Sequence, residues 1–278
     1  QPERRRGGAG GAVQVCPGLT ANQSQVTRGG NGGRGKPYPS DGPLDGEPGG
    51  GGAAGGARGT NDSRSGKNGQ NGGHGSRGQD AEPVTTEDWG VVDAHVTWLD
   101  TGLATHGTPG GGGGGGGGAQ TNGAGCLDNR APGGTGGGAG GCNGSAGQNG
   151  VSGGFSVGIL ADGAPPTLHR VRIQTGRGGH GGNAGRGGEG ANGGTSPASI
   201  SVYCTNYTGG KGGVGGNGGD GGHGAPGAGG WSIGILSASP IADLEGVSIS
   251  TGAAGLPGTP VPGGPASDPG QAVEVLVP

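Results

Sequence analysis

The chain has 278 residues, of which 86 are glycine and 26% are hydrophobic, and its formal net charge is −3. A nearly neutral chain predicts no strong electrostatic attraction to nucleic acid or to a membrane surface. No apolar stretch approaches the roughly 20 residues that a membrane-spanning helix needs. The apolar fraction is also too small for a conventional core, so we expect backbone hydrogen bonds to hold much of the fold.

We interpret the N-terminal region, residues 1–152, as a diverged repeat with a glycine-rich insertion. Alternating apolar residues predict a first strand at residues 12–15, and residues 89–101 resemble a diverged pair of strands. Between and after these segments lie glycine-rich stretches, including a run of nine glycines at residues 110–118.

The C-terminal region, residues 153–278, contains two copies of one pattern. Residues 154–160 match residues 230–236 at an offset of 76, and the same offset aligns residues 171–176 with 247–252. A further strand type follows each glycine run, at residues 198–203 and 272–277. Alternation of apolar and polar residues is typical of half-buried strands, so we expect these segments to share one small β-sheet.

Glycine-rich runs connect the predicted strands, and side chains recur in them at every third residue, here called X positions. The clearest runs are residues 177–195 and 211–223. A period of three is that of the polyproline II helix, which has no internal hydrogen bonds and must bond to its neighbours. The predicted fold is therefore mostly irregular and β, with little or no α-helix. We expect a bundle of polyglycine II helices layered on a small β-sheet built from repeats of 76 residues.

Cysteine usage and the first residue point to a secreted chain. The chain begins with Gln1, which suits a signal peptide already removed. Cys126 with Cys142 would close a short glycine-rich loop, and Cys16 with Cys204 would join the ends of corresponding strands. Buried thiols or a zinc site are the alternatives, but no Cys-x-x-Cys spacing occurs, so we expect disulfides.

No group of residues has the spacing of a catalytic, cofactor or metal site, so we expect no enzyme activity, cofactor or bound metal. No Gly-Lys-Ser/Thr sequence marks a phosphate-binding loop. His74, His180 and His223 occupy X positions, which we interpret as a solvated stripe. Arg-Gly-Gly sequences are typical of RNA-binding segments, yet these runs almost lack the aromatic residues that stack on bases. N-glycosylation sequons, which also arise by coincidence, occur at Asn22, Asn61, Asn143 and Asn206.

The runs at residues 177–195 and 211–223 resemble the glycine-helix bundles of the snow flea antifreeze and phage tail-fibre tip adhesin families. The strand segments 154–160 and 171–176 with their following glycines are similar to glycine-rich repeat proteins secreted by bacteria. The antifreeze resemblance implies ice binding by a flat face of small residues. The adhesin resemblance implies receptor binding by loops between glycine helices.

These observations favour a secreted structural protein that assembles with copies of itself into an extracellular fibre or surface layer. Exposed strand edges are templates for pairing with another chain, and a head-to-tail contact that does not close gives a filament. Other extracellular matrix or surface components are further candidate partners, and an adhesin or ice-binding protein is the alternative function. The predicted assembly strands contain Ala12, Val13, Val15, Ala272, Val273, Val275 and Val277.

Overall fold

The computed structural model describes residues 7–16, 18–21, 23–34, 36–37, 44–60, 64–92, 95–99, 102–121, 131–199, 201, 207–241 and 244–277. The chain divides into two compact units. Unit 1 contains Gln1–Gly78, His106–Ser145 and Gly188–Gly221, and unit 2 contains Gln79–Thr105, Ala146–Gly187 and Gly222–Pro278. Each unit therefore combines stretches that are far apart in the sequence.

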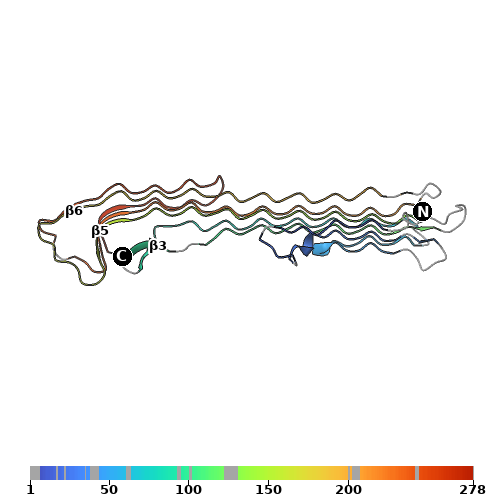
Figure 1. Ribbon diagram of the computed structural model, residues 1–278, viewed down its shortest axis with the longest axis horizontal. Helices are drawn as coiled ribbons and strands as arrows, with labels where there is room; N and C mark the ends of the chain where they lie inside the picture. The colour runs from blue at the N-terminus through green and yellow to red at the C-terminus, as the bar shows by residue number, and fades with distance from the viewer. Residues whose placement is uncertain are drawn as a thin grey trace. The chain divides into compact units, whose positions relative to one another are not determined.

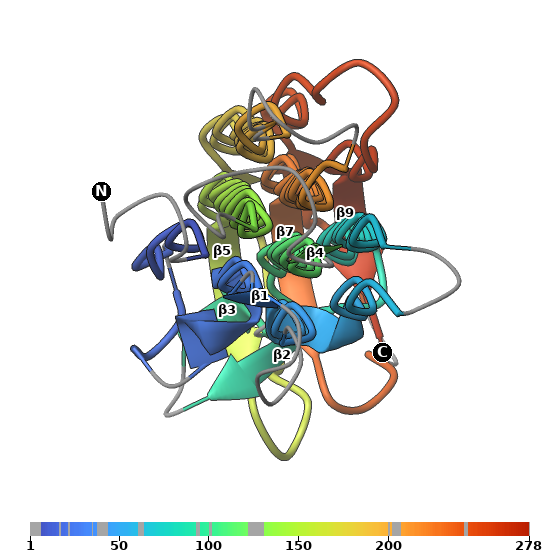
Figure 2. The same cartoon turned by 90° about the vertical axis from the view of Figure 1, so that its right-hand side faces the viewer.

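No α-helix occurs among the described residues, which confirms the expectation of little helix. Two short 3-10 helices, η2 (Gln23–Thr27) and η3 (Gly50–Gly52), lie in unit 1, where β1 (Lys36–Pro37) also pairs in parallel with β4 (Gln120–Thr121). Most of each unit consists of extended, glycine-rich segments (Figure 1). Seen end-on, these segments are coils (Figure 2), and within each unit backbone hydrogen bonds join neighbouring segments.

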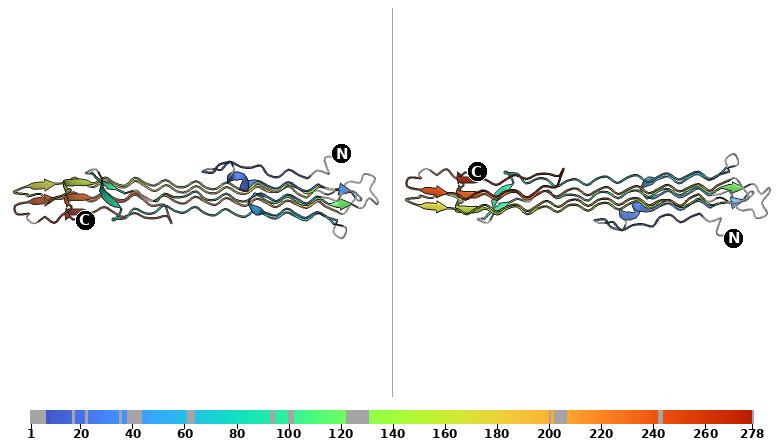
Figure 3. Two further views of the ribbon diagram at one scale, coloured as in Figure 1. Left: turned by 90° about the horizontal axis from the view of Figure 1, so that it is seen from below. Right: turned by 90° about the horizontal axis from the view of Figure 1, so that it is seen from above.

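Unit 2 contains a three-stranded parallel sheet in the order β5 (Ser156–Ala161), β7 (Ser232–Ser237), β9 (Ala272–Leu276). The strands lie side by side in both views of Figure 3. Val157 pairs with Ile233, which pairs in turn with Val273. The predicted strands at residues 154–160, 230–236 and 272–277 are thus confirmed to within two residues at each end.

A second, two-stranded sheet pairs β6 (Arg172–Gln174) with β8 (Ser248–Ser250) in parallel. Each of these strands lies against a glycine of the larger sheet. A methyl group on Gly158 would collide with the Ile173 side chain, and one on Gly234 would collide with Ile249. The expectation of one shared sheet is therefore wrong, because these strands pack on the face of β5 and β7 and do not extend its edge.

The hydrophobic core of unit 2 lies between the β5–β7–β9 sheet and an antiparallel hairpin, β2 (Trp89–Val92) and β3 (His95–Trp98). Trp231, Ile233 and Leu236 are its buried members. The Trp89 and Trp231 ring centroids are 5.5 Å apart, and Trp98 donates its Nε1–H to the Gly153 carbonyl at 2.7 Å. The region interpreted as a diverged strand pair is thus a hairpin that covers the core.

Unit 1 is organised around the nine-glycine run at residues 110–118, all of which are buried. Successive N–H groups of the run donate to three different sets of neighbours in rotation, and every third residue returns to the same set. Gly110, Gly113 and Gly116 bond to residues 135–141. Gly111, Gly114 and Gly117 bond to residues 67–73, and Gly112, Gly115 and Gly118 bond to residues 26, 47 and 44, respectively.

Close approach of the backbones explains why this run carries no side chains. A Cβ atom on Gly112 would overlap the Arg28 carbonyl, and one on Gly113 would overlap the Gly213 carbonyl. One on Gly114 would overlap the carbonyl of Ala54. The run is therefore enclosed by neighbouring backbone on all of its faces.

The disulfide of unit 1 joins Cys16 to Cys142, with 5.1 Å between their Cα atoms. The predicted pairings of Cys16 with Cys204 and of Cys126 with Cys142 are therefore wrong. The first pairing assumed that Cys16 ends a strand at residues 12–15, but these residues form no strand. The second assumed that Cys142 closes a short local loop, whereas its partner is Cys16, 126 residues away in the sequence. Cys126 and Cys204 lie outside the described residues.

Candidate functional site

The X positions form an ordered set of hydrogen-bond acceptors. In unit 1 Asn68 Oδ1 accepts the N–H of Lys211 at 2.8 Å, while the N–H of Gly69 donates to the carbonyl of the same Lys211 at 2.9 Å. One X residue and the residue after it thus hold both backbone groups of one residue in a parallel neighbour. We call this arrangement a two-point clamp.

The two-point clamp recurs in both units. Unit 1 repeats it with Asn71 on Val214 and His74 on Asn217. The clamps of unit 2 are Asp80 on His223, Asn149 on Ala225, Ser152 on Ala228, His180 on Leu256 and Asn183 on Thr259. Because each clamp fits one partner residue, the clamps set the register between segments that have few other side chains.

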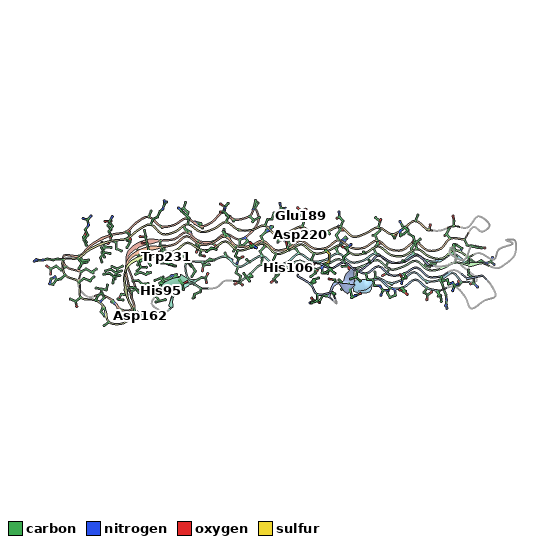
Figure 4. All side chains as sticks on the ribbon, viewed as in Figure 1. His95, His106, Asp162, Glu189, Asp220 and Trp231 are labelled. Atoms are coloured by element: carbon green, nitrogen blue, oxygen red, sulfur yellow. A yellow bond between two sulfur atoms is a disulfide. The ribbon has the colours of Figure 1, made fainter. Side chains whose placement is uncertain are left out.

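Antiparallel neighbours use the same acceptors differently. In unit 2 Gly224 and Gly227 donate their N–H groups to the carbonyls of Gly185 and Gly182 on an antiparallel segment, and the N–H of Gly187 donates to His223 Nδ1 at 3.0 Å. In unit 1 Gly190 donates to Asp220 Oδ1 at 2.8 Å. Figure 4 shows Glu189 and Asp220 on neighbouring segments. X side chains therefore bind backbone N–H groups that have no neighbouring carbonyl.

The three X-position histidines are acceptors as well. The Nδ1 atoms of His74, His180 and His223 each accept a backbone N–H at 3.0 Å, so the neutral ring carries its proton on Nε2. The Nδ1 lone pair is thereby used inside the protein. Among the described residues no group of three or more His, Cys, Asp and Glu side chains could hold a metal ion.

Sequence reasoning treated these X side chains as solvent-facing and missed their role. The available signal was the residue type, because Asn, Asp, His and Ser can all accept a hydrogen bond and are followed here by glycine or alanine. Which backbone each one holds depends on the neighbouring segment, which the local pattern does not specify.

The second candidate feature is the pair of open edges of the sheet in unit 2. Among the described residues no strand pairs with the outer edge of β5 or of β9. Ser156 donates its N–H to Trp231, and Ser232 donates its N–H to Gln271, each at 2.8 Å. Because successive residues of a strand face opposite neighbours, the N–H of Ala272 points away from β7.

The predicted assembly residues differ in secondary structure. Ala272, Val273 and Val275 lie in β9, and Val277 follows it. Residues 12–15 form no strand, so the predicted strand that was to contain Ala12, Val13 and Val15 is wrong. The N–H of Gln14 donates to the Thr27 hydroxyl at 2.9 Å, which ties this segment to η2.

Of the four sequons, Asn143 is the one within the described residues. Its side chain is 3% exposed, so a glycan on its amide nitrogen has no space in the folded unit. Asn22, Asn61 and Asn206 lie outside the described residues.

Two open pockets occur in the described parts of the chain. One, of about 380 Å³ in unit 1, includes Leu19, Val26, His74 and Thr108 in its lining. The other, of about 390 Å³ in unit 2, includes Trp98, Leu99, Leu103 and Val151. Neither lining contains a pair of titratable side chains that could share acid and base roles.

Comparison of the chain with family models, with curated proteins and with solved structures finds no match. No helix of the described residues is long and apolar enough to cross a membrane.

Proposed function

We propose that the protein is a secreted structural protein without catalytic activity, whose copies assemble head to tail into an extracellular fibre or surface layer. Its glycine-rich segments act as a bundle of polyglycine II helices, and its strands belong to repeats of 76 residues, with residues paired across the parallel strands at this offset, as Val157 with Ile233 and Ile173 with Ile249. Hydrogen bonds that return to the same neighbour at every third residue support the helix assignment. The disulfide supports an extracellular location.

The open edges of the β5–β7–β9 sheet carry the proposal of assembly. In a parallel sheet the two outer edges present complementary rows of N–H and C=O groups. The outer edge of β9 in one copy can therefore pair with the outer edge of β5 in the next, which extends the sheet. Such a contact leaves two further edges open, so it continues without closing.

Electron microscopy and sedimentation of the full chain over a range of concentrations test the proposal. We expect filaments whose amount rises with concentration. A monodisperse monomer at high concentration would contradict the structural function, and ice or receptor binding by that monomer would favour the alternative.

Two proline variants test the joint between copies. Ala272→Pro removes an outward-pointing N–H, so we expect it to abolish filaments and leave the monomer folded. Val273→Pro is the matched control, since the N–H of Val273 faces β7 and its side chain packs on the core. We expect Val273→Pro to unfold unit 2, as read by tryptophan fluorescence. Filaments of normal length from Ala272→Pro would show that β9 is not the joint.

A further inference from the structure

Asparagine followed by glycine can undergo a spontaneous reaction. The backbone nitrogen of the glycine attacks the side-chain carbonyl carbon, a five-membered succinimide closes, and ammonia leaves. Water then opens the ring to aspartate or isoaspartate. The reaction requires the asparagine amide to rotate towards the following nitrogen, and it requires that nitrogen to give up its hydrogen bond. Hydrogen bonds to either group therefore slow it.

In most Asn-Gly pairs of the described residues, both the asparagine side-chain amide and the backbone N–H of the glycine form hydrogen bonds. Asn68 and Asn71 accept clamp bonds from Lys211 and Val214, and the N–H of the glycine after each donates to a backbone carbonyl. Asn149 is held in the same way, and its Nδ2 also donates to Gly102. The pairs that begin at Asn31, Asn143 and Asn217 likewise combine a bonded amide with a glycine N–H that donates to a backbone carbonyl.

The pair Asn192-Gly193 in unit 1 differs at both groups. Asn192 is exposed, and its amide makes no hydrogen bond to any described residue. The N–H of Gly193 donates at 3.0 Å to the Asn217 side chain and not to a backbone carbonyl. A side-chain acceptor moves away more easily than the backbone of a packed segment, because it can change rotamer.

We propose that Asn192 is the site at which the folded protein deamidates first. Formation of isoaspartate adds a carbon atom to the backbone and a negative charge to the segment. The added atom shifts Gly193 and Gly194, whose N–H groups bond to Asn217 and Ala139. The new carboxylate also adds a second negative charge to a region that already contains Asp220, which accepts the N–H of Gly190, two residues before Asn192. The modification therefore loosens this segment of unit 1 as the protein ages.

The test is incubation of the full chain in mildly alkaline buffer, followed by peptide mapping with mass spectrometry that separates isoaspartate from aspartate. We expect isoaspartate at Asn192 to form about tenfold faster than at Asn68, Asn71 or Asn149, since each of those pairs has at least two hydrogen bonds to break and the Asn192 pair has one. Asn217→Ala removes the acceptor of Gly193 and should speed the reaction at Asn192 further. Asn192→Gln should remove the fast phase.

A denatured sample is the control for intrinsic reactivity, because every Asn-Gly pair is then unprotected. We expect the rates of the four pairs to converge in denaturant. Equal rates in the folded chain, or a faster reaction at a clamped pair, would overturn the proposal. Persistence of the difference in denaturant would also overturn it, since the cause would then be local sequence and not the fold.

Discussion

Substitution of a single glycine in the nine-glycine run tests whether backbone contact holds unit 1 together. In Gly113→Ala the new methyl group would overlap the Gly213 carbonyl, so residues 210–216 must move away. Three hydrogen bonds join that segment to the run, from Gly210, Gly213 and Gly216 to the carbonyls of residues 117, 114 and 111. At about 0.5–1.5 kcal/mol each, their loss lowers the free energy of unfolding by about 1.5–4.5 kcal/mol.

Gly73→Ala is the matched control, because Gly73 belongs to a neighbouring segment of the same unit and nothing lies within 4 Å of the position that its new methyl group would take. We expect this variant to keep its stability or gain about 0.4–1 kcal/mol from the reduced entropy of the unfolded chain. Denaturant unfolding followed by circular dichroism measures both changes. Equal losses in the two variants would refute backbone contact as the cause.

Two further variants examine the clamps and the disulfide. Asn68→Ala removes the acceptor of the Lys211 N–H and should lower the free energy of unfolding by about 0.5–1.5 kcal/mol, whereas Asn68→Asp keeps an acceptor and should lose less; equal losses in a denaturant titration would argue against the clamp. Cys16→Ser should destabilise unit 1 by about 2–4 kcal/mol through the lost cross-link. Its effect is measured by hydrogen exchange of residues 131–142, and unchanged protection there would contradict a stabilising role.

Local patterns were sufficient to predict the strands of unit 2. Alternating apolar residues located β5, β7 and β9, because one face of each strand must meet the core. The same reasoning failed at residues 12–15, where the alternation is too short to specify a strand and the Gln14 N–H bonds to Thr27. The predicted pairing of Cys16 with Cys204 depended on that strand and failed with it, and the predicted pairing of Cys126 with Cys142 failed because Cys142 bonds to the distant Cys16.

The hydrogen-bond partners of the X residues could not be predicted from the local sequence pattern. Asn68 and Asn192 both precede glycine in period-three runs, so this pattern is the same for the two residues. Asn68 meets the backbone of Lys211, 143 residues away, whereas Asn192 meets no described partner. Their difference in bonding, and the difference in deamidation that we propose, depend on which segment lies alongside.

The sequence by itself determined that backbone must bond to backbone, since period-three glycine leaves few side chains to form a core and an extended segment cannot satisfy its own N–H and C=O groups. It also determined where strands form, because alternation is a property of a few adjacent residues. Only the tertiary structure decided which segments are neighbours, which cysteines join and which X residues hold a partner. Glycine-rich segments are nearly identical locally, so their pairing depends on contacts between residues far apart in the chain.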